Sequence, residues 1–148
     1  MPSGTIHLKL NSIVGIPILA GIGAFAPSNE MALSIGSGYV IGSILMTPDL
    51  DTNGADLNEK NAVTIFGVFG NLWKWFWLPY AKIANHRGLS HAPLVGSFLR
   101  AIYLGIPAGF LFLWQGWGLP SGEVLFALWL GTEFASLIHI IADRYGSF

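Results

Sequence analysis

The 148-residue chain contains no cysteine. This absence excludes disulfide bonds, thiolate metal sites and a cysteine nucleophile, so any bound metal must rely on nitrogen and oxygen ligands. Charge is also scarce, because Asp, Glu, Lys and Arg make up 10% of the residues, whereas a soluble domain has about 25%. The net charge of −1 provides no basic surface for phosphates, which argues against a nucleic-acid partner.

Hydrophobic residues are abundant where charges are missing. They make up 53% of the chain, and a chain of this length corresponds to one domain. The sequence therefore predicts a single all-α domain, residues 1–148, that is integral to a membrane. Four apolar segments are expected to cross the bilayer as two helical hairpins, with an aromatic-rich helix at the interface. The crossings are approximately residues 11–27, 31–47, 93–114 and 123–142, and the aromatic segment is approximately residues 63–83.

The aromatic segment is apolar enough to span a membrane, but it carries Asn71, Lys74 and Lys82 among its tryptophans. Aromatic rings mixed with lysines are typical of the membrane–water interface. We therefore expect this segment to lie on the membrane surface or to enter and leave it as a bent re-entrant helix. Its two ends then stay on the same side of the membrane.

This topology brings seven potential metal ligands to one face of the membrane. Each hairpin leaves that face and returns to it, so polar residues far apart in the sequence are expected to meet there. Lysine and arginine residues concentrate on the same side, and the positive-inside rule makes it cytoplasmic. The seven residues are all four histidines of the chain and three aspartates: His7, His86, His91, His139, Asp49, Asp51 and Asp143.

Spacing within this set favours a metal site. His139 and Asp143 are four residues apart, which places them on one face of a helix, and Asp49 and Asp51 are two apart in a turn. Imidazole and carboxylate ligands suit Zn, Mn or Fe, so one or two such divalent ions are expected. Taken singly, each residue has another interpretation, since a histidine at a helix end is often interfacial and an aspartate in a turn often caps a helix. The stretch from His86 to His91 could equally be a loop that contacts lipid headgroups.

Two charged residues lie inside the predicted crossings. Arg100 follows His91 by nine residues and Glu133 precedes Asp143 by ten, so in antiparallel helices the two lie at similar depth. Charged groups are costly within a membrane and are rarely without a role. We expect an ion pair between them, with support of the metal ligands or contact with substrate as the alternative.

Several short motifs occur in a specific order along nearly the whole chain. They are Pro2-Ser3-Gly4 with His7, Pro48-Asp49-Leu50-Asp51, Leu78-Pro79-Tyr80, His86-Arg87 with Ser90-His91-Ala92-Pro93-Leu94, and His139 with Asp143. This ordered set resembles a bacterial family of predicted membrane metal-binding proteins, related to the YdjM-type inner-membrane predicted metal-dependent hydrolases. The resemblance implies a four-span, metal-dependent hydrolase in a bacterial inner or other internal membrane.

These features together predict a hydrolase in which a divalent metal promotes attack of water on an ester or phosphoester. Because the site is expected at headgroup depth, a lipid or lipid-linked phosphoester is the expected substrate. Arg87 and Asp51 are the candidate catalytic residues, with Arg87 clamping the anionic substrate through forked donors and Asp51 also counted among the ligands. Two alternatives stay open: a protein that binds metal without catalysis, and a structural or accessory subunit of a homo-oligomer or larger membrane complex.

Overall fold

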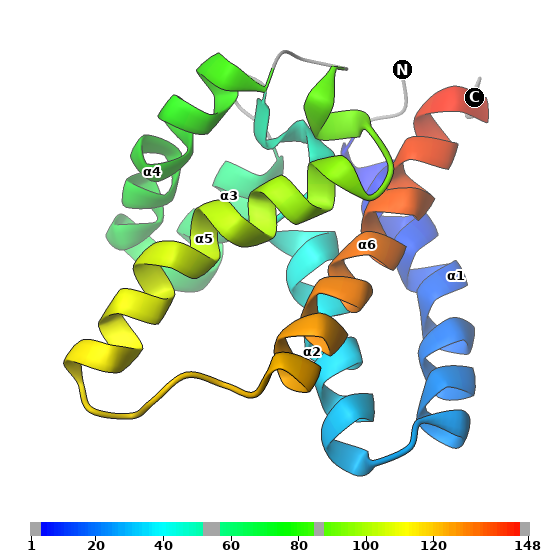
Figure 1. The fold of residues 1–148 in the computed structure, drawn as a ribbon. Coiled ribbons are helices and arrows are strands. Elements are labelled where there is room, and N and C mark those ends of the chain that lie inside the picture. Colours follow the sequence, from blue (N-terminus) through cyan, green and yellow to red (C-terminus); the bar gives the residue numbers. More distant parts are fainter. Residues whose placement is uncertain (1–3, 52–56, 85–87, 146–148) are drawn as a thin grey trace.

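The computed structural model describes the backbone of residues 4–51, 57–84 and 88–145, and the side chains of residues 8–50, 61–84 and 88–145. In these parts of the chain every regular element is helical, as the predicted all-α class requires (Figure 1). The α-helices are α1 (Gly4–Phe25), α2 (Asn29–Ile44), α3 (Leu57–Phe66), α4 (Gly70–Ile83), α5 (Val95–Trp114) and α6 (Gly122–Tyr145). Short 3-10 helices are η1 (Pro48–Asp51), η2 (Gly67–Phe69) and η3 (Leu89–His91).

Three helices are long and apolar enough to cross a membrane. They are Leu8–Phe25 within α1, the whole of α5 and the whole of α6, and they correspond to three of the four predicted crossings. Helix α2 has 16 residues, which is a length of about 24 Å, and it ends at Ile44, four residues before Pro48. The fourth crossing, through α2, therefore stays a prediction.

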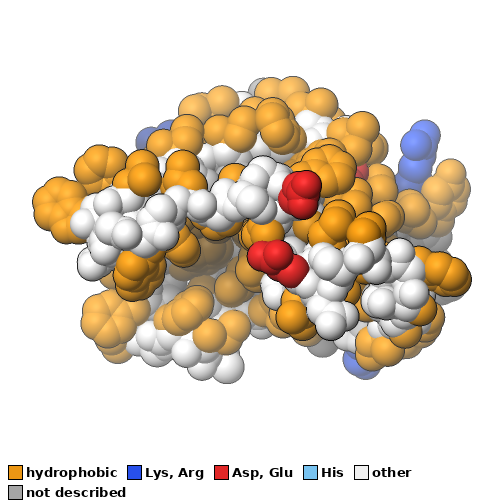
Figure 2. All heavy atoms as spheres, turned by 60° about the horizontal axis from the view of Figure 1, so that its bottom comes forward, with side chains coloured by type: hydrophobic (Ala, Val, Ile, Leu, Met, Phe, Trp, Pro, Cys, Tyr) orange, Lys and Arg blue, Asp and Glu red, His pale blue; other side chains and the backbone are white. Residues whose placement is uncertain are grey.

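The two ends of the molecule differ in character. Figure 1 shows η1, η3 and the last turns of α6 at the upper end, whereas the α1–α2 and α5–α6 connections lie at the lower end. The lower end is covered mostly by hydrophobic and uncharged side chains (Figure 2). Glu30 and Glu123 lie in the first turns of α2 and α6, respectively. The elements that carry the predicted ligands thus meet at one end of the helices.

Helices α2 and α6 pack against each other more extensively than any other pair of described helices. A Cβ atom at Gly38 would overlap the backbone carbonyl group of Leu128, and one at Gly131 would overlap that of Ile35. Small residues allow helix backbones to approach this closely in a membrane, where van der Waals packing takes the place of the hydrophobic effect. The absence of side chains at these glycines therefore fixes the position of α6, which carries His139 and Asp143, relative to α2.

Helix α1 packs on this pair through a buried tyrosine. The hydroxyl of Tyr39 donates to Asn11, whose backbone and side-chain oxygens lie 2.8 and 3.0 Å away. Gly15 leaves the space for the tyrosine ring, since a Cβ there would overlap the ring and its hydroxyl group. The first hairpin is therefore held by a polar contact as well as by small residues.

The aromatic segment is bent rather than continuous. It breaks into α3, η2 and α4 at Gly67, whose φ of +60° lies in the left-handed region, and α3 packs against α4. Figure 1 shows the two helices running down and back, so the segment is a bent pair of helices, and its position at or within the membrane surface stays a prediction. Two of its aromatic residues are buried rather than facing outward: Trp77 and Tyr80 pack against Tyr103 of α5. Tyr103 also donates a hydrogen bond of 2.7 Å to the Phe76 carbonyl.

Candidate metal site

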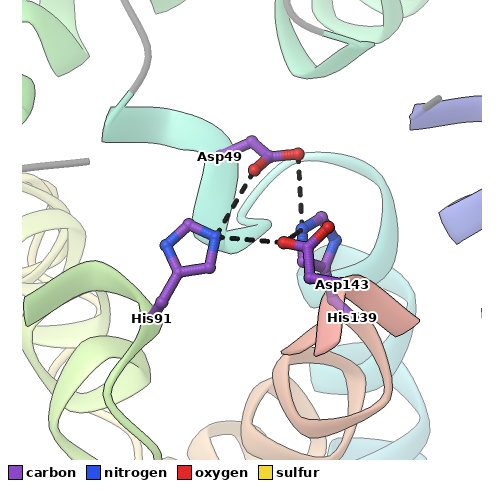
Figure 3. Close-up of side chains that lie close together, drawn as sticks. All are labelled: Asp49, His91, His139 and Asp143. Atoms are coloured by element: carbon purple, nitrogen blue, oxygen red, sulfur yellow. Dashed lines mark ion pairs between the residues drawn. The ribbon is translucent and has the colours of Figure 1, made fainter. Parts of the chain in front are cut away.

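The candidate site is built where three separate elements converge (Figure 3). Asp49 comes from η1, which follows α2, and His91 is the last residue of η3, which precedes α5. His139 and Asp143 lie four residues apart on α6, so both project from the same face of that helix. Each of the three elements thus supplies at least one nitrogen or oxygen ligand.

The four side chains face one another across short distances. His91 Nε2 lies 3.5 Å from Asp49 Oδ1 and 3.5 Å from Asp143 Oδ2. His139 Nε2 lies 3.3 Å from Asp49 Oδ2 and 3.7 Å from Asp143 Oδ2. One ligand atom from each residue can be chosen so that all four lie within 4.8 Å of one another. Both imidazoles therefore present the same nitrogen, Nε2, to both carboxylates (Figure 3).

These distances fit a cation held between the ligands. An N–H···O hydrogen bond usually measures about 2.7–3.2 Å between heavy atoms, so the contacts of 3.3–3.7 Å are longer than direct hydrogen bonds. Zinc bonds of about 2.0–2.2 Å place neighbouring tetrahedral ligands about 3.3–3.6 Å apart. An octahedral ion with bonds near 2.1 Å would place neighbouring ligands about 3.0 Å apart. Asp49 uses a different oxygen toward each imidazole, so these four atoms are not a single tetrahedral set, and it is the donor set of imidazoles and carboxylates that fits a divalent transition-metal ion.

Burial is uneven across the cluster. The side chain of His139 is 2% exposed and that of His91 9%, whereas those of Asp143 and Asp49 are 15% and 23% exposed. Although burial of the carboxyl group opposes its ionisation, the adjacent imidazoles of His139 and His91 hold the pKa of Asp49 well below its usual range. The site thus opens to the outside on its carboxylate side, where water or a substrate can approach.

Four of the seven predicted ligands are brought together in this cluster: Asp49, His91, His139 and Asp143. The other predicted residues are not tested. His7 lies in α1 and Asp51 ends η1, but their side chains lie outside the described residues. His86 and the candidate catalytic residue Arg87 also lie outside the described part of the chain. All four stay predictions.

Ser90 was not singled out from the sequence, although it precedes His91 and is fully buried. Its hydroxyl donates a hydrogen bond of 2.6 Å to the carbonyl of Pro48, the residue before Asp49. Gly96 allows α5 to approach this loop, since a Cβ at Gly96 would overlap the carbonyl of Ser90. In the sequence, the signal that could have pointed to Ser90 was its position as a small polar residue directly before the predicted ligand His91.

Glu133 and Arg100, expected from the sequence to lie at similar depth, are both buried. Glu133 Oε1 accepts from the Leu94 N–H at 3.0 Å, and its other oxygen accepts a short hydrogen bond from the Ser97 hydroxyl. Leu94 has a φ of +65°, and the Val95 N–H donates to the Pro93 carbonyl at 2.8 Å, which is the geometry of a rare, strained γ-turn. Glu133 thus holds this turn at the start of α5.

Comparisons with known proteins agree with a metal site. A family model described as "Uncharacterized metal-binding protein (DUF2227)" matches residues 2–119, a range that includes Asp49 and His91 and ends before α6. An uncharacterized protein from Aquifex aeolicus (strain VF5) is 25% identical over 75 residues, which are 51% of this chain and 47% of that protein. The chain thus spans about half the length of this curated relative. No solved structure matches.

The family match covers well over half of the chain, and it includes ligands from two of the three elements that form the cluster. The apolar helices, the convergence of imidazoles and carboxylates and the family match therefore lead to the same assignment. The chain belongs to the DUF2227 family of metal-binding proteins.

Proposed function

We propose that the protein is a membrane-embedded hydrolase that depends on a divalent metal and acts on an ester or phosphoester at the cytoplasmic face. The observation that carries this proposal is the cluster of two imidazoles and two carboxylates, open on its carboxylate side, at one end of helices long enough to cross a membrane. Four protein ligands would fill a tetrahedral ion, so catalysis would require an ion that takes a further ligand, or one of the four side chains to leave its position to water.

The roles of the residues follow from their places in the cluster. His91 and His139 are the more buried ligands and hold the ion from the side of the protein. Asp49 directs one oxygen toward each imidazole and joins η1 to the other two elements. A divalent cation bound by these residues would supply Lewis acidity that activates water and stabilises negative charge developing on oxygen.

The substrate is proposed to be a lipid or a lipid-linked phosphoester, because the site lies at the end of helices long enough to cross a membrane, where lipid headgroups would be expected. Arg87 is proposed to clamp the phosphate and Asp51 to take part in catalysis. His7, His86 and Asp51 are proposed as further ligands of the one or two ions. The relation to the YdjM-type hydrolases, the fourth crossing through α2 and a bacterial inner or internal membrane belong to the same proposal.

The test is metal analysis and activity measured on one preparation. We expect protein purified in detergent without chelator to contain at least one equivalent of a transition metal, with zinc as the expected ion. It should hydrolyse at least one member of a panel of lipid phosphoesters and carboxylic esters. Chelation should abolish that activity and the metal should restore it, because no other electrophile is available in the cluster.

The contrary outcomes are distinct. Protein that contains less than about 0.1 equivalent of metal and takes up none on titration would rule out the hydrolase. Stoichiometric metal without turnover of any ester or phosphoester would favour storage or delivery of metal. The description of the family, which mentions metal binding and no reaction, is consistent with that alternative. Migration as part of a larger complex, without bound metal, would favour an accessory subunit.

A further inference from the structure

Arg100 is the largest of the fully buried side chains and lies on α5, outside the ligand cluster. One terminal nitrogen, Nη1, donates to the Ser90 carbonyl at 2.8 Å and to the Ser90 hydroxyl oxygen at 3.2 Å. The other, Nη2, donates to the Ser136 hydroxyl oxygen at 2.7 Å. Burying a guanidinium group carries a large desolvation cost, so its retention at this position calls for a specific role.

The contacts of Nη1 lead to two of the three ligand-bearing elements. Ser90 is bonded through its backbone to His91 in η3, and its hydroxyl donates to the carbonyl of Pro48 in η1, next to Asp49. The Tyr80 hydroxyl approaches the same serine oxygen at 3.4 Å. A displacement of Ser90 would therefore move His91 directly and would release the turn that carries Asp49.

The contact of Nη2 leads to the third element. Ser136 lies on α6, three residues before His139, so the two side chains occupy neighbouring positions on one helix face. The Ser136 hydroxyl also donates to the Thr132 carbonyl at 2.8 Å, which leaves its lone pairs to accept from Arg100. The guanidinium group therefore fixes the distance between the turn of α6 that carries His139 and the loop that carries His91.

We propose that Arg100 is the positioning residue of the metal site: one planar fork of donors sets the spacing of the three elements that carry Asp49, His91 and His139. The proposal rests on the metal site of the proposed function but not on its hydrolytic activity. The planar, forked geometry matters because the guanidinium holds two separate donor nitrogens in fixed directions, whereas the three donors of an ammonium group rotate about one nitrogen. Arg100 contacts neither metal nor substrate in this proposal.

The test uses the full-length protein in detergent and measures metal affinity, the visible spectrum of the cobalt form, and thermal stability. We expect Arg100→Gln to lower the affinity for Zn²⁺ by about 10- to 100-fold, which is typical when a group that orients ligands is lost. The d–d bands of the Co²⁺ form should also change, since they report the ligand geometry. Arg100→Lys should restore less than half of the lost affinity on a logarithmic scale, although it keeps the charge.

The matched control is Tyr103→Phe. Tyr103 lies one turn beyond Arg100 on α5, and its hydroxyl donates to the Phe76 carbonyl of α4, a helix that carries no ligand of the cluster. Loss of that hydrogen bond is expected to lower the melting temperature and to leave Zn²⁺ affinity and the Co²⁺ spectrum unchanged. A role of Arg100 in stability alone would give the same pattern as this control.

Each outcome decides the matter. Folded Arg100→Gln protein with a wild-type Co²⁺ spectrum and Zn²⁺ affinity within twofold of wild type would overturn the proposal. If Arg100→Gln does not fold, Ser136→Ala provides the test, because it removes one acceptor of Arg100 and keeps the guanidinium. An altered Co²⁺ spectrum with at least threefold weaker Zn²⁺ binding in this variant supports the proposal, whereas a wild-type spectrum and affinity overturn it. Wild-type protein that binds metal but hydrolyses nothing would overturn the hydrolase and leave this proposal intact, whereas wild-type protein that binds no metal would overturn both.

Discussion

Asp143→Asn is expected to lower the affinity of the protein for Zn²⁺ by at least about 100-fold, beyond the 10- to 100-fold loss typical of residues that only orient a ligand. The Oδ2 atom of Asp143 lies 3.5 Å from Nε2 of His91 and 3.7 Å from Nε2 of His139. A single carboxylate oxygen therefore lies close to both imidazole nitrogens, where it could bind the same ion. The substitution preserves the shape of the side chain and removes its charge. Competition of the purified protein with a chromophoric zinc chelator measures the change.

Glu123→Gln is the matched control for this variant. It makes the same chemical change on the same helix, α6, but in the first turn rather than near the end where Asp143 lies. A carboxylate at the opposite end of α6 from the metal site can act on it only through the net charge of the protein. Zn²⁺ affinity should therefore stay within about twofold of the wild-type value. Equal losses in the two variants would show a charge effect without coordination, and no loss in Asp143→Asn would exclude Asp143 as a ligand.

The apolar segments could be predicted well because their signals are local. The predicted crossing at 123–142 became α6, Gly122–Tyr145, and that at 93–114 became α5, Val95–Trp114, each within a few residues. Apolar length and the turn residues at each end define such helices without knowledge of their neighbours. The first crossing, predicted at 11–27, became the longer helix Gly4–Phe25, because the residues before Asn11, in which polar and apolar side chains alternate, continue the helix.

The meeting of Asp49, His91, His139 and Asp143 was also predictable, because it depends only on which end of the helices each of these residues occupies (Figure 1). The contacts that fix their distances were not. Arg100 bonds to residues that are 10 and 36 positions away in the sequence, and no periodicity in a single helix reports such partners. Similarly, the neighbour of Gly38 in α2 is the carbonyl group of Leu128 in α6, and tertiary packing sets this contact.

Gly38→Ala is expected to destabilise the folded protein by about 3 kcal/mol or more, at the upper end of the range for overpacked sites. A Cβ atom at this position would overlap the Leu128 carbonyl group, with the carbonyl carbon 2.8 Å away. Because these are backbone atoms, no side-chain rotation can make room, and α2 and α6 must move apart along the face that they share. Unfolding by increasing fractions of a denaturing detergent, followed by circular dichroism, measures the loss.

The control for this variant lies two residues earlier on the same helix. A Cβ at Gly36 would meet nothing within 4 Å, so Gly36→Ala should leave stability unchanged or raise it by up to about 1 kcal/mol through helix propensity. The two alanines also separate packing from function, since Asp49 follows α2 whereas His139 and Asp143 lie on α6. Separation of these helices by Gly38→Ala should therefore weaken Zn²⁺ binding in the protein that remains folded, while Gly36→Ala should bind as wild type. Wild-type stability and affinity in Gly38→Ala would mean that the close approach of α2 and α6 does not set the metal site.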